Sequence, residues 1–203
     1  YKLDDVVFEG RSQKIAKILS NPSQDSGHIS VVKGALDAER ALHVKANNRT
    51  YISRGVQTKI DYHWYGKNDS FNDLEIGFRM HYDEKDRFQC EDVYNITNVF
   101  MSLETYGVKG AQGNRISSAN TFASYVMYKY KVKGLTLSPG IRYESIKLSR
   151  DDFGKSNPLR SSSDVSSRVN AISVFIPGIG FSYTINNKLS VFSGIHKGFS
   201  PPG

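Results

Sequence analysis

The sequence predicts an all-β protein, namely a section of an antiparallel up-and-down transmembrane β-barrel with about six strands in three hairpins. Three observations favour this fold. Apolar and polar residues alternate with period two, which gives each predicted strand one apolar and one charged side. The two arms of the hairpin around residues 131–134, which begin at Thr121 and Leu135, each exceed ten residues, about what a tilted strand needs to cross a bilayer. Long and short connections also alternate along the chain, as they do in outer-membrane barrels.

Residues 1–48 differ from the rest and are predicted to form an extracellular loop with short helices. Ile15, Ile18 and Leu19 have helical spacing and are stopped by Asn21-Pro22. A second short helix is predicted within residues 36–44, after a polar stretch. A loop of this length is uncommon unless it has a function.

Residues 49–203 are predicted to be the barrel section. Its apolar sides carry aliphatic and aromatic residues at most alternate positions, as in Val56, Ile60, Tyr62 and Trp64, in Leu74, Ile76, Phe78, Met80 and Tyr82, and in Phe122, Val126, Tyr128 and Tyr130. Short turns are expected near residues 66–73, 131–134 and 185–188, and long connections over 83–120 and 151–169. By the usual rule the short turns face the periplasm. Six strands do not close even the smallest such barrel, so further strands are expected outside this sequence.

Composition excludes several other classes of function. The net charge is +7, but the basic residues are scattered along the strands and no nucleic-acid motif accompanies them, so no nucleic acid is expected as a partner. The single cysteine, Cys90, permits no internal disulfide. The histidines show no metal-ligand spacing, and no nucleophile elbow or phosphate loop is present. We therefore predict no enzyme activity, no resident metal and no cofactor.

Four segments, in order, resemble TonB-dependent outer-membrane receptors. They are KANNRTYISRGVQ, GFRMHYDEKDRFQ, LTLSPGIRYESI and IPGIGFSYTINNKLSVFSGIHKGFSPPG. Within that family, the helical loop followed by NNRTYISRGVQ is most similar to the ferric dicitrate receptor group. The resemblance implies a 22-stranded barrel in the outer membrane of a Gram-negative bacterium. It also implies a partner, TonB, that is reached through a plug domain not in this chain, so we expect the sequence to be an internal piece of a longer protein.

The resemblance further implies that outer arginines bind a ferric chelate as the transported ligand. Arg54 matches one such position, and Arg115 matches another within a gap of one residue. Arginine suits carboxylates because its fork binds them bidentately. By strand alternation, however, Arg54 falls on the outward face unless a bulge intervenes. The weaker candidates for ligand binding are Arg40, Arg49, Gln57, Arg79 and His81.

Other interpretations remain open from the sequence. Each candidate side chain could instead be a solvated loop charge or a lumen residue paired with Asp or Glu. The cargo could be another siderophore, haem or an oligosaccharide, and an oligosaccharide pocket should favour aromatic residues over arginine. A soluble all-β binding module would show the same alternation.

Overall fold

The computed structural model describes residues 1–200, and for Ser163 the backbone alone. The last residues of the final resembling segment, 201–203, lie outside the described part. Within residues 1–200, no helix has the length and apolar character needed to span a membrane.

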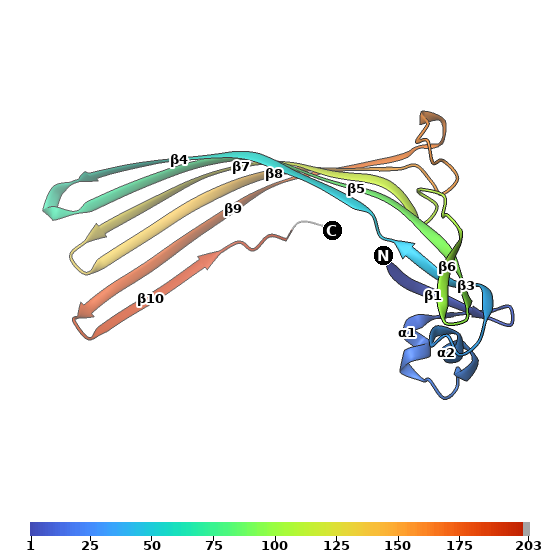
Figure 1. Ribbon diagram of the computed structural model, residues 1–203. Coiled ribbons are helices and arrows are strands. Elements are labelled where there is room, and N and C mark those ends of the chain that lie inside the picture. Colours follow the sequence, from blue (N-terminus) through green and yellow to red (C-terminus); the bar gives the residue numbers. More distant parts are fainter. Residues whose placement is uncertain (201–203) are drawn as a thin grey trace. The chain divides into compact units, whose positions relative to one another are not determined.

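Strands dominate the described chain (Figure 1). The sheet has the order β10-β9-β8-β7-β5-β3-β1-β2, and β4 and β6 also pair with β5. The strands are β1 Lys2–Phe8, β2 Arg11–Lys14, β3 Ala38–Ala46, β4 Arg49–Tyr65, β5 Phe71–Thr97, β6 Phe100–Thr105, β7 Gly113–Val132, β8 Leu135–Asp152, β9 Ser166–Asn186 and β10 Leu189–His196; the helices are α1 Ile15–Ser20, α2 Ser26–Val32 and two 3-10 turns, η1 Lys67–Asp69 and η2 Ser162–Asp164.

The chain divides into two compact units, and the long strands run from one into the other. Unit 1 comprises Tyr1–Tyr51, Lys85–Ser117 and Arg150–Arg168. Unit 2 comprises Ile52–Glu84, Ser118–Ser149 and Val169–Gly203. The predicted separation of residues 1–48 as an extracellular loop and 49–203 as the barrel section stays a prediction.

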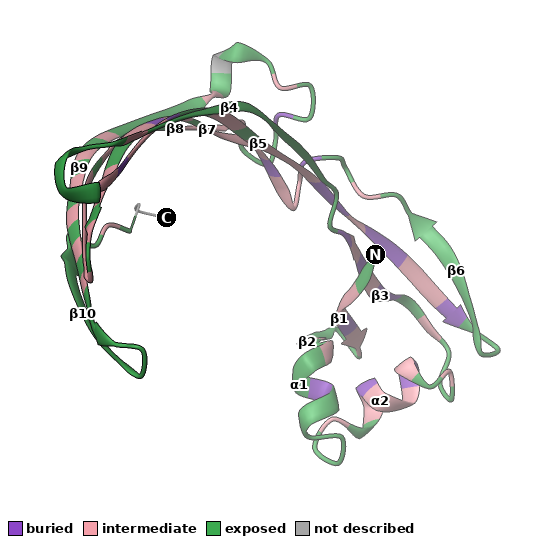
Figure 2. Cartoon of the chain, turned by 90° about the vertical axis from the view of Figure 1, so that its left-hand side faces the viewer, coloured by how far each residue is buried: buried purple, intermediate pink, exposed green. Residues whose placement is uncertain are grey.

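Unit 1 contains a small apolar core. Ile18 of α1, Val31 of α2 and Val6 of β1 are fully buried, and Ala41, Leu42 and Ile96 complete the cluster. Figure 2 shows buried positions in α1, in α2 and in the neighbouring strands. The first predicted helix is confirmed, because the spacing of its apolar residues puts Ile18 into this core while Leu19 stays 60% exposed.

The second helix predicted from the sequence is wrong. Residues 38–46 form the strand β3, which pairs antiparallel with β1 on one side and with β5 on the other. Pairing on both sides outweighs helix propensity, which is a weak preference. The second helix, α2, instead occupies part of the stretch that the sequence indicated to be polar, and it places His28 and Val31 inward.

The prediction of a connection over residues 83–120 is also wrong. β5 continues to Thr97, β6 follows, and β7 begins at Gly113. Both sides of the sheet are polar over much of this stretch, so the apolar alternation that marks a strand is missing. The three short turns are confirmed, since η1 separates β4 from β5, and two residues separate β7 from β8 and β9 from β10.

One face of the sheet in unit 2 is a polar network. The Nζ of Lys59 lies 3.0 Å from Glu75 Oε2 and 3.2 Å from Asp61 Oδ2. The Tyr125 hydroxyl donates a hydrogen bond of 2.6 Å to Glu75 Oε1. Gly77 makes room for this arrangement, because a Cβ there would lie 2.1 Å from the Tyr125 ring.

The opposite face of unit 2 is apolar and exposed. Its aromatic rings touch across neighbouring strands: Phe122 and Tyr143 are 6.4 Å apart between centroids, and Tyr143 and Phe175 are 4.9 Å apart. Nearer the short turns, Trp64 stacks on Tyr128 at 6.0 Å. Figure 2 shows exposed residues dominating β4, β9 and β10. The predicted division into a polar and an apolar side is therefore confirmed for these strands.

Candidate anion-binding site

Five neighbouring strands each place one arginine in unit 1. The strands β4, β5, β7, β8 and β9 are adjacent in the sheet. We call their residues the arginine row: Arg49, Arg87, Arg115, Arg150 and Arg168. Such a set of guanidinium groups is chemically suited to an anion with several oxygens, because each fork can bind a carboxylate bidentately.

Arg87 is the member of this row whose pKa is lowered by burial and by the charges of the other arginines. Burial lowers the pKa of its guanidinium below the ordinary value, and the positive charges of Arg115 and Arg49 lower it further. An arginine stays charged at neutral pH even so. The lowered pKa therefore reflects burial first and repulsion among like charges second, and an anion bound between the guanidinium groups would reduce that repulsion.

Four of the row's members form no ion pair. Among the described residues, none is formed by Arg49, Arg87, Arg115 or Arg168. Arg49 Nη2 donates to the side-chain oxygen of Asn47, at 3.3 Å. Arg150 differs, since its Nη2 lies 2.8 Å from Asp152 Oδ2.

Two buried donors beside the row also lack partners. Within the described residues 1–200, the Nε of Arg87 and the Nε2 of Gln89 have no hydrogen-bond partner. Most buried polar groups in native proteins are hydrogen-bonded, so orphaned ones call for an explanation. Gly113, at φ 157°, lets the backbone of β7 approach these side chains closely, because a Cβ there would lie 2.8 Å from Gln89 Oε1 and 3.1 Å from Arg87 Cδ. Donors without partners beside a row of guanidinium groups are suited to the oxygens of an anionic ligand.

The end of the row at β8 and β9 borders a hollow of about 240 Å³. Arg150, Asp152, Asp164 and Arg168 line it, together with Gly154 and Ser166. The hydrogen bond from Arg150 is the main cause that holds the pKa of Asp152 below its ordinary value. Acidic residues therefore balance the charge at this end, and the unpaired positive charge concentrates on Arg49, Arg87 and Arg115.

The loop between β8 and β9 is fastened beside the row by another arginine. Arg160 makes two hydrogen bonds to the Asp86 carboxylate, of 2.9 and 2.6 Å, and one of 2.8 Å to Asn114 Oδ1. Its guanidinium also lies 4.4 Å from the centroid of the Phe88 ring and 5.2 Å from that of Phe153. Arg160 and Asp86 are thus structural, and neither is available to a ligand.

The residues predicted from the sequence fall into different places. Arg115 and Arg49 belong to the row, although Arg115 lies in β7 rather than in a loop. Arg40 lies elsewhere in unit 1, where its backbone N–H donates to Asn95 Oδ1 at 2.6 Å and its Nη1 donates to Thr105 Oγ1 at 3.2 Å.

Gln57, Arg79 and His81 come together on the polar side of β4 and β5 in unit 2. Gln57 and Arg79 border a hollow of about 330 Å³ that Arg142 also lines. His81 Nε2 lies 3.1 Å from Asp83 Oδ2, so His81 already has a carboxylate partner within the protein. These three residues are placed together, but they form a group separate from the row.

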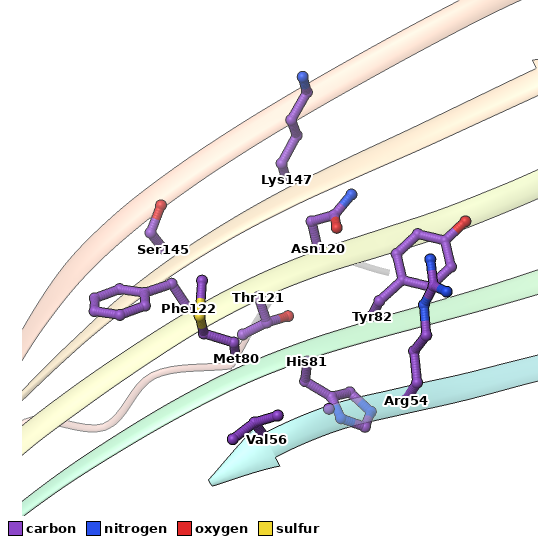
Figure 3. A pocket seen from close by; sticks show the side chains of 11 residues that line it. Arg54, Val56, Met80, His81, Tyr82, Asn120, Thr121, Phe122, Ser145 and Lys147 are labelled. Atoms are coloured by element: carbon purple, nitrogen blue, oxygen red, sulfur yellow. The ribbon is translucent and has the colours of Figure 1, made fainter. Parts of the chain in front are cut away.

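Arg54 borders a hollow of about 320 Å³ together with Gln57, Arg79 and His81. Its guanidinium, however, lies 5.0 Å from the centroid of the Tyr82 ring, on the side of the sheet that carries Val56, Met80 and Phe122 (Figure 3). This position agrees with the alternation of β4.

Sequence analysis missed Arg87, Arg150, Arg168 and Gln89. A signal for two of them was present: Arg87 and Gln89 continue the odd-numbered series that begins with Glu75, Arg79 and His81 on the same strand. Extending the period of two beyond Asp83 would have found both.

Comparison with known proteins identifies the family of the chain. The family model for the β-barrel of TonB-dependent receptor-like proteins matches residues 19–203. The chain belongs to this family. It also resembles the crystal structure of the ferric citrate transporter FecA in its unliganded form, with 13% identity and a TM-score of 0.58 over 75% of this chain.

That likeness shows the fold, and the matched part spans about 21% of the FecA chain. No curated protein matches the sequence. The predicted fold class is confirmed: the chain is a section of a TonB-dependent receptor barrel, and its sheet is not closed within the chain.

Proposed function

We propose that this chain is part of an outer-membrane receptor that takes up a ferric chelate rich in carboxylates, of the ferric dicitrate kind. The family supports a receptor of this class. In this proposal the protein lies in the outer membrane of a Gram-negative bacterium. Its short turns face the periplasm, and unit 1 faces the outside.

The observation that carries the proposal is the unpaired part of the arginine row. Arg49, Arg87 and Arg115 supply positive charge without acidic partners, and Arg87 adds a buried donor that no protein atom satisfies. A chelate of iron with two citrates carries several carboxylates and a negative charge. It would satisfy these donors and reduce the repulsion between the guanidinium groups.

Transport itself needs parts that lie outside this chain. We propose that the barrel section binds the chelate on the outer side, and that TonB acts through a plug domain that is not in this chain. The chelate is cargo in this account, and no step is an enzyme reaction.

A binding titration of the complete receptor tests the proposal. Ferric citrate is titrated into the wild-type receptor, into the double variant Arg87→Gln/Arg115→Gln, and into a control, Arg11→Gln, which removes an exposed charge elsewhere in unit 1. A hydrogen bond to a charged group contributes about 1.5–3 kcal/mol, so we expect the double variant to bind about 100-fold more weakly. Equal affinity in the double variant and the control would overturn the proposal.

The same titration separates the alternative cargoes. A receptor for haem, for another siderophore or for an oligosaccharide would bind that ligand in competition with, or in place of, ferric citrate. An oligosaccharide is neutral, so its affinity should be nearly insensitive to the loss of Arg87 and Arg115. The row's unpaired charge favours the anionic chelate over the neutral sugar.

A further inference from the structure

The apolar side of unit 2 carries very little charge, and its charged residues are gathered at one end. Along the positions of β4, β5, β7, β8, β9 and β10 that share this side, only Arg54, Glu84 and Lys147 are charged. All three lie toward the strand ends away from the short turns. A solvated surface would carry charges along its whole length, so this distribution needs a cause.

Arg54 and Lys147 border a common pocket of about 550 Å³ (Figure 3). Four adjacent strands build it, β4, β5, β7 and β8. Asn120 and Ser145 add polar groups near the two cations. The apolar side chains of the pocket are Val56, Met80 and Phe122. One pocket therefore combines two positive charges, hydrogen-bonding groups and an apolar wall.

The two positive charges have no acidic partner. Neither Arg54 nor Lys147 forms an ion pair with any residue in the range 1–200. The acid on this side, Glu84, already accepts a hydrogen bond from the Tyr82 hydroxyl. The guanidinium of Arg54 lies 5.0 Å from the centroid of the same Tyr82 ring. The pocket therefore carries a net positive charge that could bind an anionic group.

The height of the pocket along the strands fits a membrane boundary. Trp64, stacked on Tyr128 near the short turns, lies ten residues after Arg54 on the same strand. Ten strand residues span about 33 Å, which at a tilt of about 40° gives a height of about 25 Å, the height of the apolar band of such barrels. Arg54 then lies at one edge of the band, and Trp64 lies at the other.

We propose that this pocket binds a phosphate-bearing lipid of the membrane leaflet at the end away from the short turns. Arg54 would take the phosphate bidentately and Lys147 would contact it as a point charge, while an acyl chain would lie along Val56, Met80 and Phe122. The inference rests on the proposed membrane location but not on the cargo. It also gives Arg54 a function in lipid binding, on the face opposite to the one that would meet the chelate.

Lipid retention by the complete receptor tests this site. The receptor is reconstituted in nanodiscs of phosphatidylcholine with a minor fraction of diphosphorylated lipid A, extracted, and analysed by native mass spectrometry. We expect wild type to retain lipid A and Arg54→Gln/Lys147→Gln to retain about 10-fold less, a loss of about 1.4 kcal/mol. The matched control Lys129→Gln/Lys131→Gln removes two positive charges from the opposite side of β7 and should retain lipid A as wild type does.

A second measurement needs no variant. Wild-type receptor offered lipid A that lacks both phosphates should retain about 10-fold less of it than of the diphosphorylated form. Equal retention of the two lipids, or equal retention by the two double variants, would overturn the site. Ferric citrate affinity should be unchanged in Arg54→Gln/Lys147→Gln, so failure of the lipid site and failure of the chelate site give different results.

Discussion

The two units use the same kind of alternating sequence in opposite ways. In unit 1 the apolar residues turn toward one another, and Val6, Ile18 and Val31 are fully removed from solvent. In unit 2 they form rows that no part of the described chain covers, and Ile60 is 59% exposed. Polar residues differ as well, since unit 1 gathers arginines without partners whereas unit 2 pairs Lys59 with Glu75.

This difference shows that the apolar pattern of a strand does not by itself say what covers it. A buried core excludes water with protein atoms, and a membrane protein of this family excludes it with lipid. The neighbours of each row decide between the two. Helices α1 and α2 cover the row in unit 1, and in the proposed membrane location lipid would cover the rows in unit 2.

The largest expected effect comes from emptying the core of unit 1. Ile18→Ala removes a fully buried side chain and leaves a cavity, so we expect a local loss of about 2–5 kcal/mol. Hydrogen exchange of the amides in α1 and β1 measures it. The neighbouring Leu19→Ala is the control, because Leu19 is 60% exposed. Similar protection in both variants would contradict a water-excluding core.

A charge placed on the apolar row of unit 2 should have a similar but slightly smaller effect. Ile60→Arg puts a guanidinium midway between Arg54 and Trp64, where a lipid-facing charge costs about 2–4 kcal/mol. Urea unfolding of the complete receptor in lipid vesicles measures this loss. Gln57→Arg places the same group on the polar side of the same strand and should cost much less. A loss of equal size in both variants would show that the two sides of β4 do not differ.

Removing the arginine that fastens the β8–β9 loop should have a moderate effect confined to unit 1. Arg160→Ala takes away hydrogen bonds to the charged Asp86 carboxylate, each worth about 1.5–3 kcal/mol. We expect faster proteolysis within residues 153–165 and unchanged protection in unit 2. Arg11→Ala is the exposed control. Unchanged proteolysis after loss of Arg160 would mean that the loop is held by other contacts.

The smallest effect concerns pH. Burial raises the pKa of Asp4, but hydrogen bonds from Lys14 and Lys45 outweigh it, so the folded-state pKa is below the ordinary value. The stabilisation is therefore present above the unfolded pKa of about 3.9 and is lost as pH falls through the lower folded value. Thermal unfolding of unit 1 between pH 7 and pH 2 measures it.

Two variants sharpen the pH test. Asp4→Asn should already lack this part of the stability at pH 7 and should lose less on acidification, whereas Glu39→Gln, which is exposed and forms no ion pair among the described residues, should behave as wild type. An acid dependence identical in Asp4→Asn and wild type would assign the effect to other carboxyl groups.

The sequence predicted the strands that have one clean apolar side and missed those that do not. Leu74 to Tyr82 alternate without interruption and Val56 to Trp64 with one polar exception, Thr58, and both stretches lie in strands. The continuation of β5 beyond Asp83 was missed because Asp86, Arg87 and Gln89 give it no apolar side. Residues 38–46 were taken as a helix because pairing with β1 and β5 depends on segments far away in the chain, which local spacing does not show.

The candidate site was predictable only in part, for the same reason. Arg115 and Arg49 were identified through the family resemblance. Arg87 joins them only when three strands, β4, β5 and β7, lie side by side, since its neighbours are far apart in the sequence. The missing hydrogen-bond partners of Arg87 Nε and Gln89 Nε2 are a property of three-dimensional packing and leave no trace in the sequence.

The most direct test of the account asks which side of β4 meets lipid. Spin labels are placed singly at positions 56 to 61 of the complete receptor in a bilayer, and their collision rates with oxygen and with a polar nickel chelate are compared. The account predicts alternation, with labels at Val56, Thr58 and Ile60 accessible to oxygen and labels at Gln57, Lys59 and Asp61 shielded from lipid. Equal accessibility at all six positions, or alternation of the opposite phase, would contradict it.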